Sequence, residues 1–524
     1  MIKTFCKNKF LFSIISSITI LIIGCFYTVF KPNLAQQTTE ITMGQQWLQH
    51  LEEDLNPWWL METAYGKPVG NFPSFRCDNG DLVNPSKPCS AFTKLGDNYS
   101  YVTNNLDKNY IVSQSRQVYT YCVAYHLSGN PKFLSLAKAG IDWIRNYGFD
   151  RENGGAFSYL KRESRQSNPS VLKRTSQELA YALQGMAFYY YLTQDQELLP
   201  EIIQLKDFIF ETYYDPKLEM MMWVPKQVKN ENVTNNWLKQ KKHLLSQLDQ
   251  IYTYMLILAP ILPEPYQSEW KQDLLNLSRS IINEFYSPEY NTFWMEINNI
   301  GEGKIGEGKL PTDYGHSMKA FWMIYLTGKL FNNQRFIDFA QIGASRMLEE
   351  AYDVESGLWG RGISFDENDK GVRDLDKKWW VYAELDQMAG TLSLEDSSYV
   401  DKYLKSTVNW WFKNMVDHTN HGVWNLLTWP TLEKQLPKQY HWKNGFHSHE
   451  HALVGYITSQ ANQGEQVKLY FARKKGKEKD NIKPYYYTGE IVDINRSPMP
   501  SITDSNLPSI SDLNRVIISF TGIK

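Results

Sequence analysis

A short pattern of residues returns along the chain at a nearly constant spacing, and it constrains the fold more than any other feature. In each copy an aromatic or aliphatic residue is followed by Asp or Ser and, a few positions later, by a second apolar pair. The copies begin at Phe149, Tyr214, Tyr286, Tyr352 and Val416, in steps of 65, 72, 66 and 64 residues. Recurrence at such a period indicates one supersecondary unit that is used repeatedly.

Two helices of different character fit within each period. One precedes the repeated pattern, as in 133–147 and 336–350, and mixes charged with apolar residues at helical spacing, which predicts a half-exposed helix. The other follows the pattern, as in 177–191 and 317–330. Its central run over 320–326 carries no charge, which predicts burial on all sides.

Exposed and buried helices that alternate around a ring describe an (α/α)6 barrel, with about twelve helices in six pairs over residues 41–463. A linear helical solenoid is the structural alternative, although it would not explain why alternate helices are so uniformly apolar. Residues 464–524 contain three strand-like runs, over 467–472, 485–494 and 516–520. We therefore predict an all-α fold, an (α/α)6 barrel with a small C-terminal β-rich extension.

The composition admits a sugar-binding role and argues against nucleic acid. Tryptophan (17) and tyrosine (33) are abundant. Both side chains often line carbohydrate clefts, because their faces pack on sugar C–H groups while their polar edges form hydrogen bonds. A large helical core that needs big side chains is the other interpretation. The net charge of −2 offers no electrostatic footprint for nucleic acid.

Residues 1–40 are predicted to be a targeting segment and linker, outside the fold. Lys3, Lys7 and Lys9 precede an uncharged stretch over 10–30, which is long enough for a bilayer span of roughly 20 residues. The basic flank predicts that the body lies outside the cytoplasm. The alternative is a lipoprotein, because residues 21–25 resemble a bacterial lipoprotein cleavage box with Cys25 as the lipidated residue. Both interpretations give an exported body, periplasmic or extracellular, that is tethered to the membrane.

The cysteines fit export. Cys77 and Cys89 flank a turn-rich loop that a disulfide could close, and disulfides persist in oxidising compartments. Cys122 lies in an apolar helix and is predicted to be a buried free thiol.

Polar residues are concentrated at the predicted starts of the buried helices. In a barrel of this kind all inner helices run the same way, so these ends share one rim. Helix N-termini carry positive partial charge, which suits an anionic oxygen. The candidates at this rim are Arg116, Gln250, Tyr252, Tyr254, His316, Trp380, Glu384, Trp442 and His447.

Each candidate also has an ordinary structural explanation. His316 alone could cap its helix or lie in the core, Arg116 could be a buried salt-bridge partner, and the two tryptophans could be core residues. His447 is close to His449 and His451, but residues two apart on a helix do not face each other, so we predict no metal site. The functional interpretation gains because the candidates occupy equivalent places in the repeat.

Four motifs appear in order: Gln114-Ser115-Arg116 with Phe149-Asp150…Gly154-Gly155, then Gly315-His316, Lys378-Trp379-Trp380…Glu384, and Lys443-Asn444-Gly445-Phe446-His447. Over roughly residues 47–460 the chain resembles the N-acylglucosamine 2-epimerase family, which includes cellobiose 2-epimerases and mannose isomerases. The resemblance implies that His316 and His447 are acid/base residues and that Arg116 holds a sugar oxygen. It implies that Trp380, Trp442 and Glu384 hold the sugar, and we predict that Tyr254, Gln250 and Lys319 bind substrate at the same site.

Two departures from the family pattern bear on activity. The family has Glu three residues after its first histidine, where this chain has Lys319. Its sixth inner helix carries Asn-x-His-x-His, where this chain has Gln250, Tyr252 and Tyr254. On this basis a carboxylate that would orient His316 is expected to be replaced by a cation.

The predicted chemistry is proton transfer at the carbon next to the carbonyl of a reducing saccharide, giving a 2-epimerase or an aldose–ketose isomerase without cofactor. Two histidines across a cavity can remove and return that proton near neutral pH. One alternative is a polysaccharide hydrolase or lyase that uses Glu384 with Asp313 or Asp386. The other is a non-catalytic carbohydrate-binding protein of the cell envelope. The predicted partners are a saccharide or glycan and, through the N-terminal segment, the membrane.

Overall fold

The computed structural model describes residues 42–167, 174–226, 242–297, 312–363, 371–477 and 481–524. The predicted targeting segment, with Cys25, lies outside these residues. Residues 43–524 belong to one compact unit, which includes the C-terminal extension. Within the described ranges, no helix combines the length and the apolar character that a membrane crossing requires.

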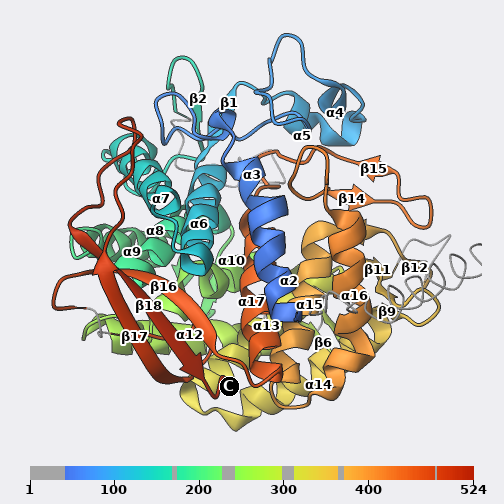
Figure 1. The fold of residues 1–524 in the computed structure, drawn as a ribbon. Coiled ribbons are helices and arrows are strands. Elements are labelled where there is room, and N and C mark those ends of the chain that lie inside the picture. Colours follow the sequence, from blue (N-terminus) through green and yellow to red (C-terminus); the bar gives the residue numbers. More distant parts are fainter. Residues whose placement is uncertain (1–41, 168–173, 227–241, 298–311, 364–370, 478–480) are drawn as a thin grey trace, which may run out of the picture. The chain divides into compact units, whose positions relative to one another are not determined.

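Six helices in the described part of the chain form a closed ring of contacts (Figure 1). Each packs on the next, and the last packs on the first. In ring order they are α6 (Ile111–Ser128), α8 (Ser176–Thr193), the continuous helix α10–η7–α11 (Leu244–Gln250, Ile251–Met255 and Leu256–Leu258), α13 (Tyr314–Phe331), α15 (Trp379–Ser393) and α17 (Phe446–Asn462).

A second set of helices packs on the outside of this ring. It consists of α2 (Met43–Gln49) against α17, α7 (Pro131–Trp143) against α6, α9 (Leu199–Tyr213) against α8, α12 (Tyr266–Ser280) against α10, α14 (Gln334–Ala351) against α13, and α16 (Lys405–Trp410), which belongs to the layer over α15. Several continue as π-helical turns: η1 (His50–Leu55), η4 (Ile144–Gly148), η8 (Ile281–Phe285), η9 (Val400–Leu404) and η10 (Trp411–Met415).

The two sets differ in burial as their sequences predict. The outer helix α14 buries residues at helical spacing, among them Phe336, Ala340, Ala344 and Met347, and exposes its other face. The inner helix α13 is buried on all sides over the continuous stretch 317–328. Burial of large apolar side chains is the main stabilising term in such a layered fold, at about 25 cal/mol per Å² of apolar surface.

The repeated sequence pattern corresponds to a short antiparallel pairing that follows each outer helix. The pairs are β3 (Tyr214–Asp215) with β4 (Met220–Met221), β6 (Tyr286–Ser287) with β7 (Thr292–Phe293), β9 (Tyr352–Asp353) with β10 (Leu358–Trp359), and single bridges between Phe149 and Ala156 and between Val416 and Val423. The turns between them contain residues with positive φ, such as Gly357 (φ 71°), which lets the chain reverse in few residues. Because of these pairings the fold is mainly helical and not all-α.

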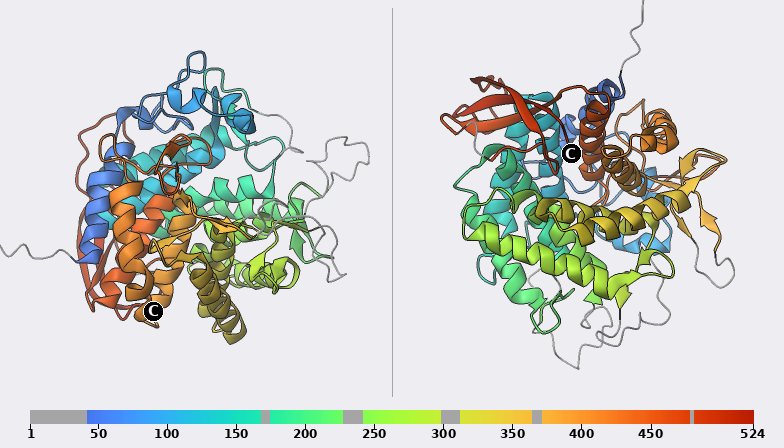
Figure 2. Two further views of the ribbon diagram at one scale, coloured as in Figure 1. Left: turned by 90° about the vertical axis from the view of Figure 1, so that its right-hand side faces the viewer. Right: turned by 90° about the horizontal axis from the view of Figure 1, so that it is seen from below.

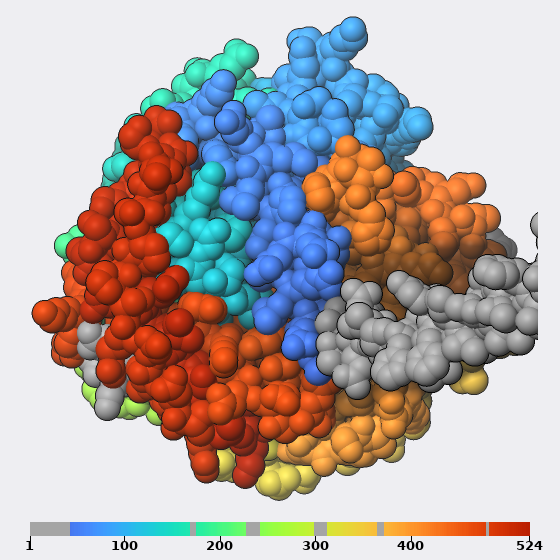
Figure 3. All heavy atoms as spheres, in the orientation of Figure 1, coloured from blue at the N-terminus to red at the C-terminus, as the bar shows by residue number. Residues whose placement is uncertain are grey.

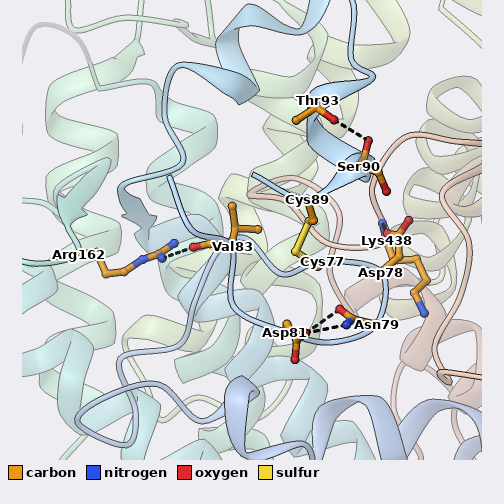
Figure 4. The surroundings of a disulfide bond; sticks show 10 residues. All are labelled: Cys77, Asp78, Asn79, Asp81, Val83, Cys89, Ser90, Thr93, Arg162 and Lys438. Carbon is orange, nitrogen blue, oxygen red and sulfur yellow. Dashed lines mark hydrogen bonds between the residues drawn. A yellow bond between two sulfur atoms is a disulfide. The ribbon is translucent and has the colours of Figure 1, made fainter. Parts of the chain in front are cut away.

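The segment between η1 and α6 is a loop region with short elements: α3 (Asn56–Trp59), η2 (Glu62–Ala64), α4 (Ser90–Thr93), η3 (Asp97–Tyr99), α5 (Ser100–Thr103) and β1 (Lys108–Tyr110), which pairs with β2 (Tyr159–Lys161). A disulfide joins Cys77 to Cys89, as expected from the sequence (Figure 4). Arg162 donates to the Val83 carbonyl (2.9 Å), and the Lys438 amide donates to Asp78 (2.9 Å), so two segments that are distant in sequence hold this loop in place. Cys122 is free and buried.

Three further small sheets connect loops near the starts of the inner helices. They are β5 (Lys242–His243) with β8 (Glu296–Ile297), β11 (Gly362–Ile363) with β12 (Arg373–Asp374), and the three-stranded set β13 (Lys377–Lys378), β14 (Leu426–Leu427) and β15 (Lys434–Gln435).

The C-terminal extension forms an antiparallel sheet in the order β16 (Val467–Lys474), β18 (Leu513–Thr521), β17 (Glu490–Pro498). Strand β16 packs on α6, α8 and α17, and the sheet lies along one side of the helical body (Figures 2 and 3). The strand expected over 485–494 begins only at Glu490. Residues 485–487 leave the sheet and pack among the helices instead.

Candidate active site

The first two turns of all six inner helices contribute to one cavity of about 430 Å³. This volume falls within the range of small-molecule sites. The residues that line it are Arg116, Gln177, Tyr181, Trp223, Leu245, His316, Lys319, Lys378, Trp379, Trp380, Tyr440, Trp442 and His447. The structure thus brings together His316, His447, Arg116, Trp380, Trp442 and Lys319.

His316 lies in the first turn of α13 and is held by the residue that caps this helix. The Asp313 carboxylate accepts a hydrogen bond from the His316 amide (2.8 Å) and contacts the ring Nδ1 at 3.0 Å. Because Nδ1 is held by Asp313, Nε2 is the ring atom left to exchange a proton with a ligand. Burial acts to raise the pKa of Asp313, but the charge and hydrogen bonds of His316 outweigh it and lower that pKa. Gly315 makes room beside His316, because a Cβ there would lie 2.6 Å from the Trp380 ring.

His447 lies in the first turn of α17, deeper in the cavity wall. Its Nδ1 is 3.1 Å from Glu384 Oε1, so this histidine also has a carboxyl group behind it. The Trp380 ring contacts both histidines, with ring centroids 4.5 Å from His316 and 5.9 Å from His447. Burial, followed by the positive charges of Arg116 and Lys319, lowers the pKa of His447 well below its usual value, so the ring is neutral at neutral pH.

Arg116 supplies a cation at the same cavity. Its guanidinium packs over the Tyr181 ring (3.9 Å) and the Trp442 ring (5.0 Å), and Nη1 donates to the Trp442 carbonyl (2.8 Å). Within the described ranges, no carboxylate forms an ion pair with it. A buried cation that is held by aromatic faces and not by an acid is available to a negatively charged oxygen of a ligand.

Asp249 lies behind the cavity wall and connects three of the side chains that line it. It forms an ion pair with Lys319 (2.7 Å) and accepts hydrogen bonds from Gln177 (2.7 Å) and Tyr181 (3.2 Å). Burial alone would lower the pKa of Lys319, but the Asp249 carboxylate outweighs it and raises that pKa. Lys319 is therefore a fixed cation of the wall.

Gln250 and Tyr254 do not reach the cavity. Gln250 donates to the Ser176 carbonyl (3.0 Å) and accepts from the Tyr254 hydroxyl (2.8 Å), while the Tyr254 ring packs on Trp270 of the outer helix α12. The reason is helical phase, because the inward face of α10–η7 carries positions 245, 249 and 252 at spacings of four and three. Of the three rim candidates on this helix, Tyr252 therefore faces inward as expected, whereas Asp249 takes the inward place that the sequence analysis gave to Gln250.

Glu384 lies beneath the cavity, in a buried hydrogen-bonded cluster. The Tyr252 hydroxyl is 3.1 Å from Glu384 Oε1 and also contacts Glu450 Oε2. Burial and the neighbouring Glu450 charge raise the pKa of Glu384 well above its usual value, and burial raises the pKa of Glu450 to about 7. Glu384 thus contacts His447 instead of lining the space for a ligand. Asp386 points elsewhere, toward Trp359, Thr407 and His451.

One group of described residues could offer ligand atoms to a metal ion: Glu384, His447 and Glu450, within 4.8 Å of one another. The oxygens of Glu450 already accept hydrogen bonds from tyrosine hydroxyls, and the Lys319 charge stabilises both carboxylates. The contacts therefore support a hydrogen-bonded cluster, and we assign no metal to it.

The sequence profile of the N-acylglucosamine 2-epimerase (GlcNAc 2-epimerase) family matches residues 92–437. This chain belongs to that family. Its relatives include a cellobiose 2-epimerase from Ruminococcus albus, 24% identical over 327 residues, which cover 60% of this chain and 78% of the relative. Another is a cellobiose 2-epimerase from Dictyoglomus turgidum, 22% identical over 358 residues, covering 64% and 84%.

Solved structures share the fold of this N-acylglucosamine 2-epimerase family member. A cellobiose 2-epimerase from Spirochaeta thermophila superposes with a TM-score of 0.63 at 15% identity, covering 82% of this chain and 99% of that one. A D-mannose isomerase superposes with a TM-score of 0.60 at 14% identity, covering 79% and 98%. Each solved chain is covered almost whole by about four fifths of this chain. His447 and the C-terminal extension lie beyond the family match, which ends at residue 437.

The structure shows that Lys319 does not leave His316 without a carboxylate. The sequence predicts that His316 lacks a carboxylate in this family member, because Lys319 stands where the family has Glu. Asp313 supplies one from the other direction, at the helix cap, and Lys319 is paired with Asp249. The single departure at Lys319 is thus matched by two acids, Asp313 and Asp249, that the motif comparison did not single out for these roles.

Lys378 is a further cavity residue to which the sequence analysis gave no role. Its Nζ donates to Asn425 Oδ1 (2.8 Å), and burial lowers its pKa to about 7. For Asp313 a sequence signal existed, since Asp directly before an apolar helical segment is an N-cap pattern. For Asp249 and Lys378 none did, since their partners are distant in sequence.

Proposed function

We propose that this protein is a sugar 2-epimerase or aldose–ketose isomerase on an (α/α)6 barrel, which acts on a reducing saccharide by proton transfer next to the carbonyl. One observation carries the proposal. Two histidines line one cavity, each with Nδ1 within 3.1 Å of a carboxyl oxygen, and the Trp380 ring contacts both. The family membership and the similarity to cellobiose 2-epimerases and a mannose isomerase support it.

The proposed reaction begins with the open-chain sugar, whose C2 proton is acidified by the C1 aldehyde. His447, which burial keeps neutral, removes this proton through Nε2, and His316 returns a proton from the other side of the enediolate. Return to the opposite face of C2 gives the epimer, and return to C1 gives the ketose. No redox group is needed in either direction.

Arg116 is proposed to stabilise the enediolate oxygen. Its guanidinium is preorganised by Tyr181 and Trp442 and lies among the first turns of the inner helices, whose N-termini add positive potential. Loss of a preorganised donor of this kind costs about 10²- to 10³-fold in kcat. Trp380 and Trp442 provide apolar faces on which sugar C–H groups can pack.

The test is solvent exchange at C2. The purified protein is incubated with glucose, mannose or cellobiose in D2O, and deuterium at C2 is followed by proton NMR together with product formation. Exchange that depends on both His316 and His447 supports the proposal. A protein that leaves C2 protonated in all three sugars, at concentrations that saturate binding, contradicts it.

Glycan binding without turnover is the second candidate. The observation that favours it is the depth of His447, whose side chain is only 8% exposed. Calorimetric binding of a saccharide that His447→Ala leaves intact, with no C2 exchange in the unchanged protein, selects this alternative. A hydrolase is less well supported, because no carboxylate is among the described residues that line the cavity, whereas glycoside hydrolysis ordinarily needs two.

We also propose that the body is exported and tethered to the membrane. The Cys77–Cys89 disulfide supports an oxidising compartment, and the sequence over 1–30 provides the basic flank and the uncharged stretch. A reporter fused after Lys524 that works only outside the cytoplasm should be active. Loss of tethering in Cys25→Ala selects the lipid over the transmembrane anchor, and cytoplasmic reporter activity refutes export.

A further inference from the structure

The C-terminal extension reaches into the helical ring beneath the cavity. Between β16 and β17 the chain places three consecutive tyrosines, Tyr485, Tyr486 and Tyr487, against the later turns of the inner helices. Tyr485 and Tyr487 are each 2% exposed. The Tyr486 hydroxyl donates to the Tyr252 carbonyl (3.1 Å), and the Tyr487 hydroxyl is 2.9 Å from that of Thr391.

Tyr485 contacts the buried carboxyl cluster directly. Its hydroxyl donates to Glu450 Oε1 at 2.5 Å. Glu450 is surrounded by other donors as well, since Tyr119 is 3.4 Å from Oε1, Gln387 is 3.4 Å from Oε2, and Tyr252 contacts Oε2. Glu384, in contrast, has a buried Oε2 without a hydrogen-bond partner.

The contacts of Tyr252 require one proton on the two glutamates. A phenol has a single proton to donate, so a hydroxyl that bridges two carboxyl groups donates to one and accepts from the other. The group with more donors is the better place for the negative charge, and that group is Glu450. In the arrangement consistent with these contacts, protonated Glu384 donates a hydrogen bond to the Tyr252 oxygen, and the Tyr252 hydroxyl donates to ionised Glu450. Tyr485 donates to the other oxygen of Glu450.

We propose that Tyr485 is a positioning residue that the C-terminal extension contributes to the site: its hydroxyl holds Glu450 ionised, so the shared proton stays on Glu384, beneath His447. A neutral Glu384, whose Oε1 lies 3.1 Å from His447 Nδ1, then adds no negative charge beside the ring, and Nε2 remains a base toward the cavity. The kinetic part of this inference rests on the proposed function, whereas the protonation part does not.

Removal of the Tyr485 hydroxyl has a definite expected direction. Glu450 loses a hydrogen-bond donor, so its negative charge is less stabilised and it binds a proton more readily than Glu384 does. The shared proton therefore moves through Tyr252 from Glu384 to Glu450. Glu384 becomes an anion 3.1 Å from His447 Nδ1, which raises the pKa of His447. The other groups that face the cluster, Lys319, Asp249, Arg116, His316, Lys443, Tyr119 and Tyr486, are unchanged by the substitution.

The test compares Tyr485→Phe with Tyr487→Phe in the full-length chain. Both variants remove one hydroxyl from the same segment, but Tyr487 contacts Thr391 and no carboxyl group. The His447 ring is followed by NMR on ring-labelled histidine, assigned by its loss in His447→Gln, and titrated without sugar. We expect the His447 midpoint to rise by about one pH unit in Tyr485→Phe, as for a new neighbouring charge, and to stay unchanged in Tyr487→Phe.

A second variant keeps the inference testable if Tyr485→Phe fails to fold. Glu450→Gln removes the competing carboxyl group, leaves Glu384 as the ionised member and is expected to raise the same midpoint. The acidic limb of the pH profile of C2 exchange should move with it. Equal midpoints in unchanged protein, Tyr485→Phe and Glu450→Gln overturn the inference. A raised midpoint in a protein without C2 exchange retains it and refutes the proposed function instead.

Discussion

Each of the two histidines of the cavity has a carboxyl oxygen close to Nδ1, but only His316 is hydrogen-bonded to it, and the two rings lie at different depths. Nδ1 lies 3.0 Å from a carboxylate oxygen at His316 and 3.1 Å at His447. The side chains of His316 and Asp313 are 18% and 34% exposed, whereas those of His447 and Glu384 are 8% and 0% exposed. Depth and the charge of the partner therefore distinguish the two halves of the site, because the pKa of Asp313 is lowered and that of Glu384 is raised.

This difference teaches how one residue type can serve two roles. Water reaches the His316 half, so this histidine can exchange its proton with solvent between turnovers. The His447 half is closed by Tyr252, Glu450 and Tyr485, so contacts within the protein determine which of its groups carry a proton. A buried neutral imidazole suits the base, and a ring in contact with solvent suits the acid that must be recharged.

The largest expected effect is the loss of either ring. His447→Ala should lower the rate of C2 exchange about 10²- to 10⁴-fold, the range for an acid/base group. His316→Ala should lie lower in that range, because water can partly replace an exposed proton donor. His418→Ala, at a side chain that is 57% exposed, is the control and should leave the rate unchanged. Equal losses in the two variants would break the distinction between the halves.

The stability of the fold should depend on the buried ion pair between Lys319 and Asp249 at the cavity wall. Lys319→Met leaves Asp249 buried without its cation and should cost about 3–5 kcal/mol in the free energy of unfolding. Lys402→Met breaks the exposed pair with Glu349 and should cost about 0–1 kcal/mol. Denaturant unfolding measures both. Lys319→Glu, which restores the family residue, should be at least as damaging, because it places a carboxylate against Asp249.

The partly exposed Asp313 carboxylate should contribute less to the rate than the two histidine rings. Asp313→Asn removes the charge that orients His316, and we expect kcat to fall about 10- to 100-fold, since a hydrogen bond to a charged group contributes about 1.5–3 kcal/mol. A thermal denaturation curve separates this effect from the weakened helix cap. An unchanged kcat would show that solvent alone orients His316.

The smallest expected effect is a pH dependence of the free energy of unfolding to which His447 contributes. The pKa of His447 is lowered in the folded chain from 6.5, so the unfolded state binds the proton first as the pH falls. Stability from this group is thus complete above the unfolded pKa and declines below it, by about 1.4 kcal/mol at pH 5.5. His447→Gln should make the decline between pH 7.5 and 5.5 shallower by this amount in unfolding curves, while His126, His441 and His449, whose pKa burial lowers to about 3, keep their own contributions. An unaltered slope would place the acid sensitivity elsewhere.

Much of this protein could be predicted from local sequence. The period of the repeated pattern located the helix pairs, and the contrast between α14 and α13 separated outer from inner helices, because burial on one face or on all sides leaves a direct trace in residue type. The ends of the inner helices then located His316, His447, Arg116, Trp380 and Trp442, since the starts of helices that run the same way around a ring must meet.

The tertiary structure decided which charges meet. The phase of the helix over 244–258 brought Asp249 and Tyr252 inward and turned Gln250 and Tyr254 outward, a choice of about 100° per residue that a degenerate apolar helix does not reveal. It also paired Lys319 with Asp249, and it carried Tyr485 from the C-terminal extension to Glu450. Such contacts join residues that are distant in the chain, and their strength comes from burial, which no local pattern of residues records.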